Sequence, residues 1–427
     1  MGEGKPRLRV PIRNQIEMQW VSLDEALDSD HQVRIVWAAV CRLDLKSWLS
    51  EIKAVERHVG RDATDPRLLL ALWIFATLKG IGSARELDRL CRESLPYKWL
   101  CGGVSVNYHM LSDFRSQGGE KWDDLLTQIV AVLLSADLVS MERVAQDGMR
   151  VRASAGKSSF RRRDRLEEYL DEARQQVQAL KRLAEEDTAE LTKRQRAARE
   201  RAARERQERI EEAMRQRDEL QKQREESAKK SCRKVDEARA STTDPEARNM
   251  KFANGGYWPG YNVQFSTDTA SGVIVGVAVT NAGTDAEELP PMLDQLDERY
   301  DRLPKEVLVD GGFATVDTID DASKRGCTVY APLKDKEKQE AKGIDPHAPK
   351  KGDSEPVAQW RSRMGTEEAK SIYRLRCQTA EWVNAQCRNR GLWQMPVRGR
   401  PRCRIVALLY AIAHNLIVGE GLRPVTA

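Results

Sequence analysis

One stretch of this chain constrains its fold more than any other: the middle of residues 157–251 consists almost entirely of Arg, Lys, Glu, Gln and Ala. Between residues 161 and 240 there are 24 Lys and Arg against 20 Asp and Glu. Apolar residues recur here at alternating spacings of four and three, the a/d pattern of a coiled coil. They are Leu166, Leu170, Ala173, Val177, Leu180 and Ala184. The pattern predicts a helical hairpin that interrupts a globular domain and reverses near residues 186–193.

The charge of the predicted hairpin has two interpretations. Opposite charges at i and i+4 are typical of solvated helices that need no partner. The alternative is an arm that contacts DNA or a second protomer, although charge of mixed sign gives little net attraction to phosphate. An unopposed basic trio at the start of the stretch is predicted to bind DNA; it consists of Arg161, Arg162 and Arg163.

The sequence before the hairpin is helical in pattern from Ser22 to about Ser140. Capping boxes begin two of its segments, at residues 22–25 and 83–86, and Pro66 suits a first helical turn. An all-α domain over residues 1–140 is predicted. Its turn at residues 80–86, with Arg85 and Arg89 on the following face, is compatible with a helix-turn-helix that reads DNA. A turn that only packs two helices of a bundle fits equally well.

Strands and helices alternate after the hairpin. The predicted elements are strands 261–265 and 273–279, helix 289–300, strand 307–309, helix 316–325, strand 328–330 and helix 405–417. Residues 284–287 are expected to form a capping box before the first of these helices, and residues 335–356 a loop. Strand, helix, strand implies a right-handed parallel crossover. The fold class is therefore mixed α+β and α/β, with a ribonuclease H-like order over residues 141–427.

Three acidic residues stand in distinctive settings. Asp147 and Asp310 each follow a short apolar run and precede Gly, so each is expected where a buried strand ends. Ligands bind at such strand ends in open sheets. Glu381 lies in a helical segment whose one face, at 100° per residue, also carries Tyr373, Arg376, Asn384 and Arg388. That face is expected to point at the two Asp.

A set of three carboxylates is suited to binding divalent metal ions. Mg²⁺ prefers oxygen ligands and is commonly held by a few carboxylates together with substrate phosphates. Two such ions can clamp the attacking and leaving oxygens of an in-line phosphoryl displacement. Any one of the three acids alone is better explained by a turn or a solvated helix. As a set, Asp147, Asp310 and Glu381 predict a metal-dependent catalytic site.

These motifs resemble those of the DDE transposases of bacterial insertion sequences. Asp147-Gly148 resembles the first acidic motif of that family, and residues 310–313, Asp-Gly-Gly-Phe, resemble the second. The third is a Tyr-Arg-Glu-Lys signature, matched by Tyr373, Arg376, Glu381 and Arg388. Here one extra residue separates Arg from Glu, and Arg replaces Lys. Asn415-Leu416 resembles the closing motif, and residues 97–103 with 111–115 resemble an InsH-like N-terminal domain.

The resemblance implies a DNA transposase that cleaves at the ends of its element and transfers the strand to target DNA. It implies catalysis by the three acids with two Mg²⁺ or Mn²⁺ ions, and DNA-end binding by residues 1–140. Arg376 and Arg388 would contact phosphates, or else form salt bridges within the helices. A homodimer on DNA is expected, because two DNA ends must be brought together.

Composition agrees with this interpretation. A length of 427 residues exceeds the usual single-domain range of roughly 50–250, so at least two domains are expected. A net charge of +5 is compatible with nucleic acid. The eight Cys have no zinc-site spacing, which is typical of reduced thiols in the cytoplasm. The resemblance implies that this is the cytoplasm of a bacterium, near its nucleoid. With no signal-like N-terminus, and with its longest apolar run at residues 68–78, no membrane association is expected.

Two rival functions remain open from the sequence. One is a nuclease of the same fold that hydrolyses phosphodiesters without strand transfer. The other is a catalytically inactive scaffold in which the charged helices are the working part. The carboxylates do not separate the first rival from a transposase.

Overall fold

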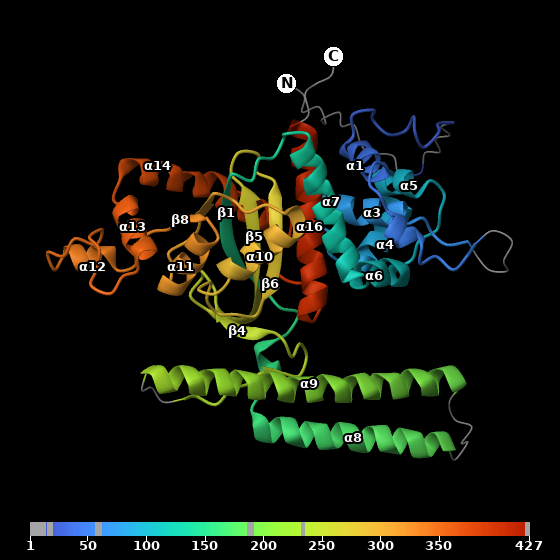
Figure 1. Ribbon diagram of the computed structural model, residues 1–427. Helices are drawn as coiled ribbons and strands as arrows, with labels where there is room; N and C mark the ends of the chain where they lie inside the picture. The colour runs from blue at the N-terminus through green and yellow to red at the C-terminus, as the bar shows by residue number, and fades with distance from the viewer. Residues whose placement is uncertain (1–13, 15–19, 56–61, 186–191, 232–234, 423–427) are drawn as a thin grey trace, which may run out of the picture.

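The computed structural model describes residues 14, 20–55, 62–185, 192–231 and 235–422. A mixed body of helices around one sheet carries two long helices that lie apart from it (Figure 1). The body has one main hydrophobic core, and this core includes both the N-terminal helices and the sheet. The fold is thus mixed α/β, as the sequence predicts.

The N-terminal part is helical. Its helices are α1 Gln32–Cys41, α2 Lys46–Leu49, α3 Pro66–Leu78, α4 Ala84–Glu93, α5 Leu95–Cys101, α6 Tyr108–Ser116 and α7 Gly119–Ser135. The expected caps are present. The side chain of Asp65 accepts a hydrogen bond from the backbone amide of Arg67, and that of Ser83 accepts one from the backbone amide of Glu86. Residues 68–77 of α3 are all buried, because neighbouring helices surround it. A helix that is apolar on every side needs such an environment.

Six strands form the main sheet. They are β1 Arg143–Arg152, β4 Arg248–Lys251, β5 Tyr257–Asp268, β6 Ile274–Thr280, β7 Glu306–Leu308 and β8 Thr328–Tyr330. Strand β1 is antiparallel to β5 and parallel to β7, and β7 is parallel to β8. Strands β4 and β6 share the other edge of β5, to which both are antiparallel. The strands predicted at residues 261–265 and 273–279 are present and pair as the antiparallel hairpin β5–β6, and the predicted parallel crossover, from β7 to β8, is confirmed.

Side-chain amides cover the outer edge of β6. Asn415 accepts from the amide of Ile274 at 2.8 Å and donates to its carbonyl at 2.7 Å. Gln295 does the same to Val277, at 2.8 and 3.0 Å. These residues belong to α16 (Arg400–Leu422) and α10 (Leu289–Tyr300). The two amides take the place of a further strand, which protects the edge from other chains.

Helices α11 to α14 lie on the β8 side of the body, at the opposite end from α1–α6 (Figure 1). They are α11 Val316–Lys324, α12 Lys336–Glu340, α13 Glu355–Met364 and α14 Glu367–Arg376. A π-helical turn Cys377–Glu381 leads from α14 to α15 Trp382–Asn389, where the ring of Trp382 contacts His414 of α16. Two expectations are wrong here. Helix α12 lies within the expected loop 335–356, and α10 has Glu288 at its N-cap, with no side-chain cap from residues 284–287.

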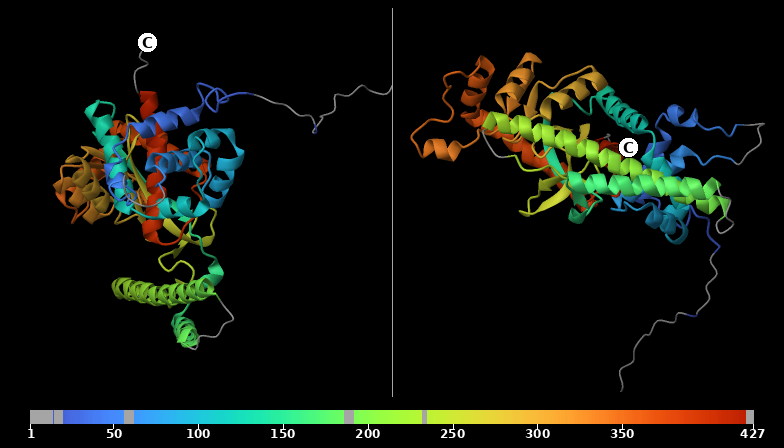
Figure 2. Two further views of the ribbon diagram at one scale, coloured as in Figure 1. Left: turned by 90° about the vertical axis from the view of Figure 1, so that its right-hand side faces the viewer. Right: turned by 90° about the horizontal axis from the view of Figure 1, so that it is seen from below.

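The two long helices are α8 Arg163–Glu185 and α9 Lys193–Ser231, which we call the arm (Figure 2). They pack antiparallel: Leu166 lies in one cluster with Ala213, while Leu170 and Ala173 lie in another with Ile210. The predicted helical pair is confirmed, whereas its supercoiling stays a prediction. The expected reversal falls mainly on residues 186–191, which lie outside the described residues. Both clusters are separate from the core of the body.

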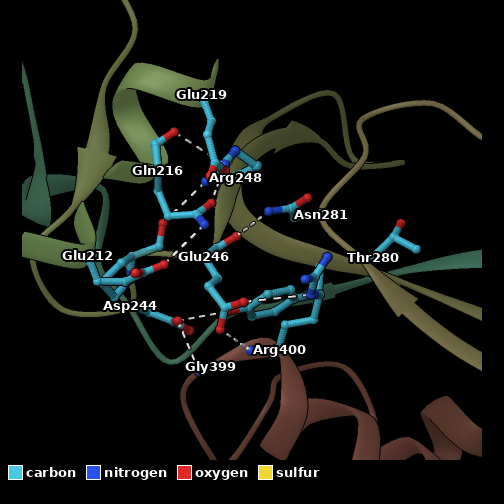
Figure 3. A network of polar contacts seen from close by, with 12 residues as sticks. Glu212, Gln216, Glu219, Asp244, Glu246, Arg248, Thr280, Asn281, Gly399 and Arg400 are labelled. Atoms are coloured by element: carbon cyan, nitrogen blue, oxygen red, sulfur yellow. Dashed lines mark hydrogen bonds and ion pairs between the residues drawn. The ribbon is translucent and has the colours of Figure 1, made fainter. Parts of the chain in front are cut away.

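A polar network joins the arm to the body (Figure 3). Arg248 of β4 donates to the side chain of Gln216 in α9 at 2.5 Å. Next to it, the Glu246 carboxylate accepts the amide of Arg400 at 2.8 Å, and its carbonyl accepts from Asn281 at 2.9 Å. Arg248 therefore attaches the arm to the sheet by hydrogen bonds, and the apolar clusters of the arm are separate from the main core.

Within the described residues, α16 is the one helix long and apolar enough to cross a membrane. Most of it is buried against α3, α7 and β6. A core helix of a soluble protein meets the same criteria of length and composition, so the helix is weak evidence for a membrane.

Candidate active site

The sequence predicts a strand end at Asp147, but the structure places this residue inside β1. Its strand continues to Arg152, because the antiparallel ladder with β5 runs along all of it. The parallel ladder with β7 does stop early, at Ala145. Asp147 therefore stands two residues beyond the last pair with β7, and its side chain is 18% exposed.

Asp310 follows β7 by two residues, as expected for a strand end. The amide of Gly312 donates to its carboxylate at 3.1 Å. Asp147 and Asp310 line one open cavity of about 830 Å³, together with Asp285 and Arg388. Two of the three predicted acids thus reach the same cavity from neighbouring strands.

Glu381 is connected to this site through Arg376. The guanidinium donates to Asp147 at 2.8 Å and to Glu381 at 2.7 Å. Arg376 and Glu381 are five residues apart, and the π-helical turn between them has the i to i+5 spacing that puts such residues on one face. The extra residue in the signature is therefore absorbed by the local helix geometry.

Three donors hold the carboxylate of Asp147. Besides Arg376, the side-chain amide of Asn384 donates at 2.9 Å and the amide of Gly148 at 3.0 Å. Burial raises the pKa of Asp147, and the charge and hydrogen bond of Arg376 oppose that rise. Nearby, burial raises the pKa of Tyr373 to about 12, so this phenol stays protonated at neutral pH.

The donor chemistry fits a hard divalent cation. All of the predicted ligands are carboxylates, and a positive group, the guanidinium of Arg376, already bridges two of them. In this arrangement, no three His, Cys, Asp or Glu among the described residues are grouped closely enough to hold a metal ion. Arg376 occupies one oxygen of Asp147 and one of Glu381, so an ion held by both acids must use their other oxygens or displace the guanidinium.

The predicted DNA-binding arginines have different surroundings. Arg376 is buried, with 8% of its surface exposed, and makes the salt bridges that the sequence left as an alternative. Arg388 is exposed at the cavity. Arg89 pairs with Glu86 and Glu93, and Arg85 stacks over the ring of Tyr108. Their contacts with DNA stay predictions.

The basic trio before α8 is not unopposed, which corrects the expectation. Arg162 lies 3.3 Å from Glu237, and Arg163 lies 2.8 Å from Glu167. Arg161 donates to the carbonyls of residues 158 and 160. The acidic partner of Arg162 comes from beyond the arm, so sequence proximity could not show it.

Four polar residues at this site have no functional role predicted from the sequence: Asp285, Asn262, Gln264 and Asn384. Asn384 was placed on the right face but given no role, although it contacts Asp147. Asp285 was assigned to a capping box, but its carboxylate accepts from Asn262 and Gln264 of β5 at 2.7 Å each. The signal in the sequence is the alternation of apolar and polar residues along β5, and the polar residues Asn262 and Gln264 are buried in the structure.

Comparison with known protein families gives two matches. Residues 228–416 match the transposase DDE domain, and residues 21–117 match a transposase domain, DUF772. No curated protein and no solved structure matches the chain. The first match includes Asp310 and Glu381, whereas Asp147 lies outside both.

Together the two matches define the chain as a transposase, a class of enzymes that act on DNA. It belongs to the DDE transposases of insertion sequences.

Proposed function

We propose that this transposase cleaves the phosphodiester at each end of its element and joins the freed 3′-hydroxyl to target DNA. Asp147, Asp310 and Glu381 are its catalytic carboxylates. One observation carries the proposal: a single guanidinium bridges Asp147 and Glu381, although Asp147 and Arg376 are 229 residues apart in sequence, and Asp310 shares the cavity of Asp147. Asp147 is the largely buried acid of the set, and burying a carboxylate is costly, so its place beside Arg376 and Glu381 points to a use for the converging acids.

The sheet order supports a ribonuclease H-like catalytic domain over residues 141–427. Its order is β6-β5-β1-β7-β8, with three antiparallel strands followed by two that are parallel to β1. The arm, within residues 157–251, leaves and re-enters this domain between β1 and β5. Residues 1–140 are the proposed DNA-end-binding domain.

The carboxylates would hold Mg²⁺ or Mn²⁺, two ions in the full complex. When bound, such ions stabilise the negative charge that develops on phosphate oxygens during in-line displacement. The chain itself contributes orientation: the side chain of Asn384 donates to Oδ2 of Asp147 and the amide of Gly148 donates to Oδ1, so each oxygen of this carboxylate is fixed. Arg388, exposed at the cavity, supplies a cation for the DNA backbone. Arg376, once released from one acid, adds a second.

The partners follow from the chemistry. Terminal repeats and target DNA are the proposed substrates, and a homodimer forms on DNA because two ends react together. The proposed location is the bacterial cytoplasm, at the nucleoid.

The test uses Asp310→Asn, Asp147→Asn and Glu381→Gln in the full chain. With Mg²⁺ or Mn²⁺, we expect the wild type to cleave element-end DNA and to transfer a precut 3′-hydroxyl end, and each variant to lose both reactions by at least about 100-fold. Cleavage without transfer of the precut end would identify the nuclease rival. Unchanged behaviour of Asp310→Asn, with no cleavage by the wild type, would identify the scaffold.

A further inference from the structure

We propose that Asp285 is a fourth carboxylate of this catalytic centre, and that it holds a divalent cation together with Asp310. The inference rests on the proposed function above. It adds to the three acids a ligand from the turn between β6 and α10, a segment that no transposase motif in the sequence marked.

Asp285 and Asp310 lie against the same glycine. The amide of Gly312 donates to Asp310 at 3.1 Å. A Cβ built on Gly312 would lie 4.0 Å from Oδ2 of Asp285. Both carboxylates also line the cavity of Asp147. Two acids from different loops thus approach one backbone position at the cavity.

On its other side, Asp285 lies against the residue that follows Asp147. A Cβ on Gly148 would lie 2.3 Å from Oδ1 of Asp285 and 2.5 Å from the side-chain nitrogen of Gln264. Any other residue at position 148 would displace these groups. The Gly of the Asp147-Gly148 motif therefore makes room for Asp285, which stands between the backbones that carry Asp147 and Asp310.

Two buried amides orient this carboxylate. Asn262 and Gln264, 1% and 0% exposed, both donate to Oδ1 of Asp285 at 2.7 Å. Polar side chains inside a sheet cost stability unless they are hydrogen-bonded, so their presence points to a group that must be held in place. Neither amide carries a charge, so neither neutralises the carboxylate.

Oδ2 of Asp285 remains for a ligand. Among the residues that the structure describes, no side chain or amide donates to Oδ2, and no Lys or Arg forms an ion pair with Asp285. Asp147 and Glu381, by contrast, share the charge of Arg376. A fixed carboxylate with a free oxygen and no cationic partner is suited to a hard cation.

The test measures Mn²⁺ binding to the full chain by isothermal titration, without DNA. We expect Asp285→Asn to weaken binding at least tenfold and to leave the melting temperature of the metal-free protein unchanged. The matched control is Glu287→Gln, an exposed acid two residues further along the same turn that does not line the cavity of Asp147. Wild-type affinity in Asp285→Asn would overturn the proposal.

A second variant, Asp285→Cys, tests ligation directly. The variant is made with Cys41, Cys232 and Cys377 replaced by Ser, because Cys41 and Cys377 are exposed thiols that would bind Cd²⁺ themselves. In this background the thiolate at position 285 should bind Cd²⁺ and add a sulfur-to-metal charge-transfer band that the parent and Glu287→Cys lack at the same Cd²⁺ concentration. Absence of that band from folded Asp285→Cys would also overturn the proposal. Asp310→Asn distinguishes failure of the role of Asp285 from failure of the proposed function. If Asp310→Asn loses Mn²⁺ binding while Asp285→Asn keeps it, only the role of Asp285 fails. If Asp310→Asn also keeps Mn²⁺ binding and DNA cleavage, the proposed function fails.

Discussion

At the scale of single residues, Arg376 is the counter-charge of a largely buried acid. Its side chain is 10% exposed and that of Asp147 is 18% exposed, so solvent screens this ion pair weakly. Removing one partner of a buried pair leaves the other charge without compensation, which costs more than the pair itself contributes.

Arg376→Met should therefore lower the free energy of unfolding by about 3 kcal/mol in metal-free buffer. Adding Asp147→Asn should restore most of the loss, because no buried charge then remains without a partner. Urea denaturation of the two single variants and the double variant measures this. A double variant as unstable as Arg376→Met would contradict the assignment.

His414 is a residue whose burial makes stability depend on pH. It lies in the core of α16, its Nε2 bonded to the carbonyl of Gly272 at 2.9 Å and its Nδ1 without a partner. Burial lowers its pKa from 6.5 to about 4. Between pH 4 and 6.5, His414 is therefore protonated in the unfolded chain and neutral in the folded protein.

The free energy of unfolding should fall as the pH falls from about 6.5 to about 4, by about 1.4 kcal/mol per pH unit and about 3 kcal/mol in total from this residue. Above pH 6.5 both states are neutral at His414 and the contribution is constant. His414→Gln keeps a donor for Gly272 but does not titrate. Comparing wild type and variant across this range isolates the effect; parallel pH curves would refute it.

At the scale of elements, the π-helical turn Cys377–Glu381 shows how one extra residue fits into a helix. A one-residue insertion in an α-helix either rotates everything after it by about 100° or is confined to a local bulge. Here it is confined: Arg376 before the turn and Asn384 after it both contact Asp147.

Deleting exposed Gln378 should convert the turn to regular α-helix and keep both flanks in place. We expect the deletion to preserve the melting temperature and DNA cleavage. Deleting exposed Ala385 from α15 should instead rotate Arg388 away from the cavity and abolish cleavage. Circular dichroism and a cleavage assay on both deletions check this, and equal damage from both would contradict it.

The sequence predicts elements better than their ends and contacts. Periodicity placed α10 at residues 289–300 and β8 at residues 328–330, because each has a complete apolar face. Periodicity predicts the end of β1 at Asp147, whereas the strand continues to Arg152. The strand is extended by pairing with β5, which is separated from β1 in sequence by the whole arm. The sequence pattern assigned Asp285 to a cap, because the competing amides on β5 are distant in sequence.

For the candidate site, too, the sequence predicts the residues better than their contacts. The three acids could be predicted from local motifs, whereas the acidic partners of Arg162 and the bridging position of Arg376 could not. Those contacts depend on tertiary packing that no local pattern encodes.

At the scale of the whole molecule, the body and the arm differ in how they are held together. The body has one main core, in which α16 contacts both α3 and β6. The arm has two small clusters of its own and a polar attachment. Regions with few buried apolar contacts open more readily than the rest.

Ile210→Ala should therefore speed hydrogen exchange in α8 and α9 without changing β1 or β5. Leu408→Ala, in the body core, should cost about 2–5 kcal/mol and raise exchange in α3 and β6 together. Hydrogen exchange with mass spectrometry resolves the two patterns. Loss of protection in β1 on Ile210→Ala would show that arm and body unfold as one unit.

The place of the arm has a consequence for synthesis on the ribosome. Strand β1 emerges before the arm, but its two neighbours, β5 and β7, emerge after it. The arm can form early from local contacts, whereas β1 keeps both of its edges exposed until β5 has left the exit tunnel, and one edge until Leu308 has left it. The strand that carries the first acid must therefore be shielded from association with other chains while the whole arm is synthesised.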